Sequence, residues 1–136
     1  MRNRDMTRKF PVAGALFAAA LSLASPALAG AADYVFEPVK ADIKNGDAVT
    51  LAVRLLHKPS GEPVPNAVII QSRIDMAPDG MAEMTSPLTP LPSPEPGVYA
   101  FKSALAMQGR WLLSIAAKVQ GEPETVIGKI TFRATR

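Results

Sequence analysis

Residues 111–134 read WLLSIAAKVQGEPETVIGKITFRA, and apolar and polar positions alternate along both halves of this stretch. The apolar positions are Trp111, Leu113, Ile115, Ala117 and Val119 in the first half, and Val126, Ile130 and Phe132 in the second. A period of two is typical of a strand that buries one face. The intervening QGEPE, residues 120–124, contains the Gly and Pro that favour a turn. The stretch therefore predicts a β-hairpin with Trp111 in the core.

Similar segments occur upstream, and Gly, Pro and Asn residues separate them. They lie at residues 34–43, 48–56, 68–75 and 97–101. No helical periodicity remains after residue 33. Six or seven short strands at regular spacing indicate an all-β fold, and we expect an immunoglobulin-like β-sandwich of about seven strands.

Residues 76–96 interrupt this pattern, because these 21 residues contain six prolines. A structureless loop of this length is uncommon in a compact domain. The segment should therefore contain an extended edge strand or serve a function. Residues 84–91 are the candidate strand, since proline is tolerated at a sheet edge.

The first 29 residues have the features of a cleaved secretory signal peptide. An uncharged segment, residues 10–24, follows a basic start, and Ala27-Leu28-Ala29 ends the region. We expect cleavage after Ala29, with cleavage after Ala32 as the alternative, and export to the bacterial periplasm. An uncleaved anchor is the other interpretation, but the apolar run is shorter than the roughly 20 residues of a spanning helix. The expected domain is residues 30–136.

Removal of this segment changes the charge balance of the chain. The whole sequence has 15 Lys and Arg and 12 Asp and Glu, and residues 1–29 hold four of the former and one of the latter. Residues 30–136 thus carry 11 of each and are neutral overall. A nucleic-acid partner is not expected, because phosphate backbones select a positive footprint.

Composition also restricts the chemistry. The chain has no cysteine and one histidine, which excludes disulfides, thiolate nucleophiles and metal sites built on two histidines. No G-x-S-x-G elbow or phosphate-binding glycine loop is present. We therefore expect no enzyme and no catalytic residues.

Four methionines remain after the predicted cleavage, and they are the candidate metal ligands: Met76, Met81, Met84 and Met107. Thioether sulfur is soft, needs no deprotonation and selects Cu(I) or Ag(I) over hard cations. If residues 84–91 form a strand, chain direction brings all four to one end of the sandwich. The alternatives are methionines that fill gaps in the core and exposed methionines in a protein interface.

Other side chains offer weaker candidates. His57 is either an additional metal ligand or a solvated surface residue. Asp75, Asp79 and Glu83 resemble a calcium loop only loosely, because their spacing does not fit the known pattern and Pro78 interrupts it. Arg73 and Arg110 are interpreted as surface charges at strand ends.

Four further motifs follow one another along the chain: GEPVPNA at residues 61–67, the methionine-rich segment 75–84, PGVY at residues 96–99 and MQGRW at residues 107–111. Together they resemble the YtkA-like/FixH-like family of small exported or membrane-tethered domains. The resemblance covers about residues 48–134. It implies an immunoglobulin-like fold and a role in handling copper or other heavy metals, and it carries the four methionines over as the site.

These observations favour a periplasmic, non-enzymatic protein that binds Cu(I) or Ag(I) through methionine. Its expected partner is a membrane copper transporter, or a component of an efflux or oxidase-assembly system. One alternative is a metal-free immunoglobulin-like interaction module associated with such a system. A carrier of a small apolar ligand is a further alternative, which no motif specifically supports.

Overall fold

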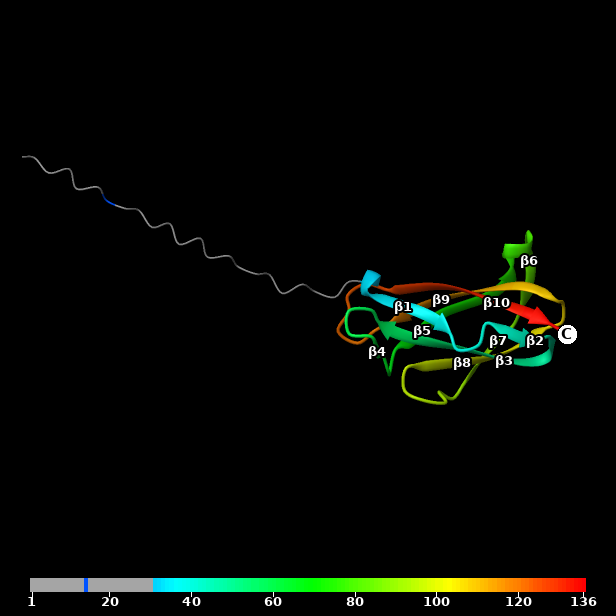
Figure 1. Ribbon diagram of the computed structural model, residues 1–136, viewed down its shortest axis with the longest axis horizontal. Helices are drawn as coiled ribbons and strands as arrows, with labels where there is room; N and C mark the ends of the chain where they lie inside the picture. The colour runs from blue at the N-terminus through cyan, green and yellow to red at the C-terminus, as the bar shows by residue number, and fades with distance from the viewer. Residues whose placement is uncertain (1–13, 15–30) are drawn as a thin grey trace, which may run out of the picture.

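The computed structural model describes Gly14 and residues 31–136 (Figure 1). The predicted signal peptide, apart from Gly14, lies outside the described residues. Within residues 31–136 the fold is almost entirely β, with two 3-10 turns, η1 (Ala31–Asp33) and η2 (Ala77–Asp79). No described helix has the length and apolarity that crossing a membrane requires.

One sheet contains five strands, four of them in the order β1-β3-β8-β7, with β4 paired to β3. The strands are β1 (Tyr34–Pro38), β3 (Gly46–His57), β4 (Glu62–Pro63), β7 (Leu88–Leu91) and β8 (Val98–Leu105). All the pairings in this sheet are antiparallel.

The second sheet has the order β2-β10-β9-β5-β6. Its strands are β2 (Asp42–Lys44), β5 (Val68–Met76), β6 (Met81–Ser86), β9 (Gly109–Lys118) and β10 (Val126–Thr135). The pairings are antiparallel except that β2 runs parallel to β10.

This strand order confirms the expected immunoglobulin-like sandwich. In that fold the A, B, E and D strands form one sheet, and C, F and G form the other. Here β1, β3, β8 and β7 take the first set of places, and β5, β9 and β10 take the second. The predicted β9–β10 hairpin is present, and its register places Trp111 opposite Phe132.

Two predicted segments are each divided between the sheets. Residues 34–43 form β1 in one sheet and β2 in the other, rather than one strand. Residues 76–96 contain β6 and β7, and the chain changes sheet at Pro87. Ser103 on β8 stabilises this crossing, because its Oγ donates to Pro87 O at 2.9 Å and lies 3.0 Å from Ser86 Oγ. The expected edge strand thus exists, but as two short strands.

The core lies between the sheets and consists of the inward-facing side chains of the longer strands. The largest fully buried members are Phe101, Phe132, Leu51, Leu55, Ile74 and Met76. Trp111 is also buried, as predicted. The alternation that the sequence predicts is clearest on β10, where every second residue is buried against the other sheet and the rest face solvent.

Candidate functional site

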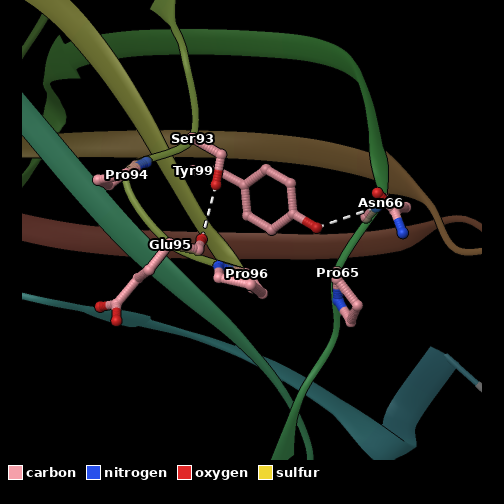
Figure 2. A pocket seen from close by; sticks show the side chains of 9 residues that line it. Pro65, Asn66, Ser93, Pro94, Glu95, Pro96 and Tyr99 are labelled. Atoms are coloured by element: carbon pink, nitrogen blue, oxygen red, sulfur yellow. Dashed lines mark hydrogen bonds between the residues drawn. The ribbon is translucent and has the colours of Figure 1, made fainter.

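The end of the sandwich where β8 begins contains an open cleft of about 700 Å³. Pro65, Asn66 and Ala67 form one wall, and residues 93–97 with Tyr99 form the other (Figure 2). We call residues 63–67 and 93–99 the tyrosine end. The Tyr99 hydroxyl donates to Val64 O at 2.7 Å and accepts from Ala67 N at 2.9 Å. Because its hydroxyl already has two internal partners, Tyr99 is a structural clamp in this cleft.

Gly97 completes the tyrosine end. It has φ +83°, and an added Cβ would lie 3.2 Å from Val64 N. Burial raises the pKa of Tyr99, and the hydrogen bond from Ala67 offsets only part of that effect. The GEPVPNA and PGVY motifs therefore meet as a packing and hydrogen-bonding unit rather than as a reactive site.

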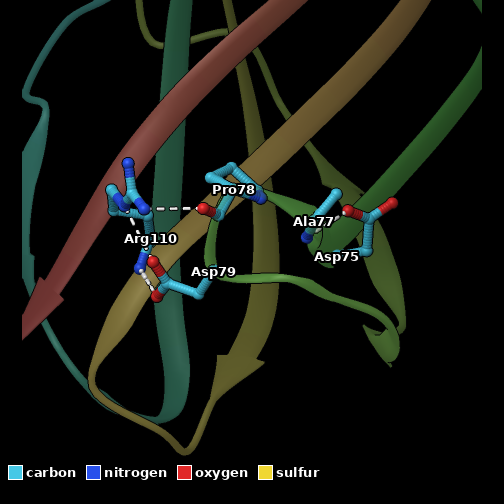
Figure 3. Close-up of polar contacts among 5 residues, drawn as sticks. All are labelled: Asp75, Ala77, Pro78, Asp79 and Arg110. Carbon is cyan, nitrogen blue, oxygen red and sulfur yellow. Dashed lines mark hydrogen bonds and ion pairs between the residues drawn. The ribbon is translucent and has the colours of Figure 1, made fainter.

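The opposite end carries the methionines. We call the segment 75–84 together with residues 106–111 the methionine end. Asp79 Oδ2 accepts the Arg110 backbone N–H at 2.7 Å, and Asp79 Oδ1 accepts Arg110 Nε at 2.8 Å (Figure 3). Arg110 also donates to Pro78 O at 2.6 Å. These bonds fix the η2 turn onto the start of β9.

Asp75 closes the other side of the same turn. Its Oδ1 accepts the Ala77 N–H at 2.9 Å, and its Oδ2 accepts Arg73 Nε at 2.9 Å. Burial alone would raise the pKa of Asp75, but the Ala77 hydrogen bond and the Arg73 guanidinium outweigh it and lower that pKa. The pKa of Asp79 is also lowered, first by the backbone hydrogen bond from Arg110 and then by its side chain. Arg73 and Arg110 are therefore exposed charges, as predicted, although Arg73 lies within β5 rather than at its end. Each is also hydrogen-bonded to the segment around the turn.

Gly109 lies directly against this turn. Its φ is +138°, and an added Cβ would lie 2.7 Å from Met76 Cε and in contact with Asp79 Oδ2. Trp111 Nε1 donates to Met107 O at 3.1 Å, which fixes the β8–β9 turn. The MQGRW motif therefore interlocks with the methionine-rich segment, and Met76 points its methyl group toward the turn that carries Met107.

The four methionines differ sharply in burial. Met76 is the last residue of β5, is 0% exposed and belongs to the core. Met81 opens β6 opposite Met76 and packs partly buried against that core. Met84 and Met107 are 41% and 39% exposed. Met76 is therefore a core residue at the end of a strand, which agrees for this residue with the alternative that methionines fill gaps in the core.

Met84 lies in an irregular part of the β5–β6 pair. The ladder joins Asp75 to Thr85 and then Met76 to Met81, so residues 82–84 have no partners on β5. This bulge, the η2 turn and the β8–β9 turn share one end of the molecule, near the C-terminus in Figure 1. The sequence predicted this convergence from chain direction, but it missed the Asp79–Arg110 contact that fixes it.

His57 lies at the other end from the methionines, and Asp75 and Asp79 within the methionine end already have other partners. His57 ends β3 at the tyrosine end, where its Nδ1 lies 2.8 Å from Ser60 Oγ and its ring packs near Tyr34. Asp75 and Asp79 already bind backbone N–H groups and guanidinium groups. Within residues 31–136, no three His, Asp or Glu side chains form a group that could hold a metal ion.

Comparison with known proteins gives one family and several distant folds. No curated protein matches the chain. Three solved structures show the general likeness. The Lin-41 filamin domain has 20% identity over 74% of this chain and 93% of its own, with a TM-score of 0.41. The ZirS C-terminal domain has 14% identity over 100% and 88%, with a TM-score of 0.44. A conjugative transposon lipoprotein from Bacteroides eggerthii has 11% identity over 76% and 98%, with a TM-score of 0.33.

The family match is more informative, because it covers the residues at both ends of the sandwich. The model of the YtkA-like family matches residues 28–116, which include the tyrosine end and the methionine end and stop within β9. This match spans well over half of the 136 residues. The chain belongs to the YtkA-like family.

Proposed function

We propose that this protein is an exported, non-enzymatic accessory protein that binds Cu(I) or Ag(I) through methionine thioethers. The observation that carries the proposal is the exposure of Met84 and Met107, at 41% and 39%. Gap filling in the core accounts for Met76 and Met81, because both pack against buried residues. It does not account for two exposed methionines at the same end of a domain that has no cysteine.

The proposed site consists of Met84 and Met107, with Met81 as a partly buried third ligand. Met76 is buried in the core, where it packs against the β8–β9 turn, and we do not propose it as a ligand. Neutral sulfur ligands suit a soft monovalent cation and also suit an oxidising compartment, where thiols form disulfides. The Asp79–Arg110 and Trp111–Met107 hydrogen bonds fix the η2 turn and the β8–β9 turn, so the backbone next to the proposed ligands is held in place.

The proposed compartment and partner are supported by the sequence and by the family resemblance, and the site itself does not bear on them. The signal-like residues 1–29 support export to the periplasm. A protein that holds Cu(I) by a few thioethers, without catalytic groups, is suited to passing the ion to a second protein. We propose a membrane copper transporter, or an efflux or oxidase-assembly component, as that second protein.

The test is an anaerobic Cu(I) titration of residues 30–136, which include every described strand, against a chromophoric chelator. Wild type should bind one ion, and Met84→Leu and Met107→Leu should each weaken binding about tenfold or more. Leu keeps the apolar volume and removes the sulfur. Met76→Leu is the matched control and should leave Cu(I) affinity within about twofold of wild type. Wild-type protein that takes no Cu(I) from the chelator would contradict the proposal.

The metal-free interaction module is the alternative function. Exposed Met84 and Met107 would then be apolar contacts for a partner, which Leu would replace and Ser would not. If this alternative is correct, wild type should bind no Cu(I), and replacement of both by Leu should leave partner association intact whereas replacement by Ser should weaken it. If copper transfer is correct, the double Leu variant should lose copper-dependent association.

A further inference from the structure

The outer face of the second sheet is basic along two of its three inner strands. β9 and β10 contain Arg110, Lys118, Lys129 and Arg133, and they contain no Asp or Glu. All four alternate with core residues, so they point away from the other sheet. Residues 30–136 are neutral overall, so the cations of β9 and β10 are balanced by carboxylates on other elements, among them Asp42 on β2 and Asp75 on β5.

Three of these cations form no ion pair among the described residues. Arg110 is paired with Asp79 at 2.8 Å. On the neighbouring strand β5, Arg73 is paired with Asp75 at 2.9 Å. Lys118, Lys129 and Arg133 form no ion pair in residues 31–136, although the charge of Lys129 helps to lower the pKa of Asp75 and Arg133 is opposite Asp42 on β2. This part of the sheet carries more cations than carboxylates and is therefore positive overall.

Exposed aliphatic residues lie beside these cations. Ile127 is 64% exposed and Val68 61%, while Ile70, which is 54% exposed, lies at the bulge of β5 and has no partner on β9. In the register, Ile127 is opposite Ala116, Ala116 is opposite Gln71, and Val68 is opposite Lys118. The small side chains of Ser114 and Ala116 leave a depression of about 160 Å³ between Arg73, Gln71 and Ile127. Exposed aliphatics around a shallow depression are typical of an interaction surface.

We propose that this face docks an acidic segment of a partner protein. The partner would insert one apolar side chain into the depression beside Ile127 and place its carboxylates against Lys118 and Lys129. Charge complementarity argues for an acidic partner. The depression on a flat sheet argues for a protein rather than an anionic lipid surface, because it fits one projecting side chain. The inference stands independently of copper binding, since the face excludes Met84 and Met107.

The test uses a fluorescent peptide of about 12 residues, in which Asp and Glu flank a central Leu, and a control peptide with Lys in place of the acids. The acidic peptide should bind residues 30–136, and the affected NMR amides should lie in β5, β9 and β10. Binding should weaken severalfold between 50 and 300 mM NaCl, because salt screens exposed charges. Tight binding of the basic peptide would overturn the proposal.

Matched variants locate the contact. Lys129→Glu should weaken peptide binding about tenfold, whereas Lys102→Glu, an exposed charge on β8 of the other sheet, should change it less than twofold. Ile127→Thr should weaken binding, whereas Val39→Thr, which is 45% exposed outside this sheet, should not. Equal effects within either pair would overturn the assignment of the face.

Two further measurements distinguish the proposed acidic partner from a membrane surface and from a second copy of this chain. Binding to phosphatidylcholine vesicles containing a quarter of phosphatidylglycerol, without binding to the peptide, would overturn the proposal in favour of a membrane surface. Self-association in sedimentation equilibrium that Ile127→Thr abolishes would overturn it in favour of a second copy of this chain. A monomer that binds the acidic peptide and not the vesicles supports it.

Discussion

The two ends of the sandwich are closed by different chemistry. At the tyrosine end, a neutral phenol bonds two backbone groups, and Gly97 allows the strands to approach. At the methionine end, two carboxylates bond guanidinium and backbone N–H groups, and Gly109 makes room for Met76. Both ends are tied down, but only the methionine end combines a fixed frame with exposed side chains of one unusual chemical type. That difference is why we propose the methionine end, and not the tyrosine end, as the binding site.

Truncation of Met76 should have the largest effect on stability. Met76 is 0% exposed and lies in the core, so Met76→Ala should lower the free energy of unfolding by about 2–5 kcal/mol. Met107→Ala at the same end should cost less than about 0.5 kcal/mol, because Met107 is 39% exposed. Urea denaturation of both variants measures the contrast. Equal losses of stability in the two variants would contradict the distinction between Met76 as a core residue and Met107 as an exposed, proposed ligand.

Gly109→Ala should have the next largest effect, and Gly121→Ala is its matched control. Both glycines have positive φ, at +138° and +86°, but only an added Cβ at Gly109 meets other atoms, Met76 Cε and Asp79 Oδ2. Gly121→Ala should cost about 1 kcal/mol from backbone strain alone. Gly109→Ala should cost about 1–3 kcal/mol more, because overpacking adds to the strain. Thermal unfolding with equal losses would show that the close contact at Gly109 has no effect on stability.

Tyr99→Phe tests the tyrosine end and should cost about 1–2 kcal/mol. It leaves Val64 O and Ala67 N without their partner, while the ring and its packing remain. Tyr34→Phe, which removes a single bond to Glu122, should cost less. Chemical denaturation of both compares them. A smaller loss for Tyr99→Phe than for Tyr34→Phe would contradict its role as the clamp of this end.

The two ends should respond to opposite extremes of pH, with the smallest effects on overall stability. The pKa of Asp79 is lowered from 3.8, so its stabilising contribution is present above that value and is lost as pH falls through the folded-state pKa. The pKa of Tyr99 is raised from 10.0, so its contribution is present below that value and is lost as pH rises further.

NMR shifts can follow each end separately during the titration. The Arg110 amide, which donates to Asp79, should shift below about pH 4. The Ala67 amide, which donates to Tyr99, should shift only above about pH 10. Asp79→Asn should remove the acid transition at Arg110 and leave Ala67 unchanged. An acid transition that persists in Asp79→Asn would assign it to another group, with Asp75 as the first candidate.

Most strand positions could be predicted from the sequence, because alternation records which side chains face a core. The β9–β10 hairpin and the burial of Trp111 follow from that pattern alone. The changes of sheet between β1 and β2, at residues 38–42, and between β6 and β7, at Pro87, could not be predicted in this way. The sheet that each strand joins depends on hydrogen-bond partners far along the chain. The Asp79–Arg110 pair was missed for the same reason, because 31 residues separate its members.

The sequence by itself determined that this is an all-β chain with four candidate thioethers and no thiol, because composition and periodicity are local properties. Only the tertiary structure decided which methionines are accessible. Met76 and Met84 are eight residues apart in one motif, yet one is 0% and the other 41% exposed. The physical reason is that burial depends on what the opposite sheet and the neighbouring turn bring against each side chain, and those contacts come from residues far along the chain.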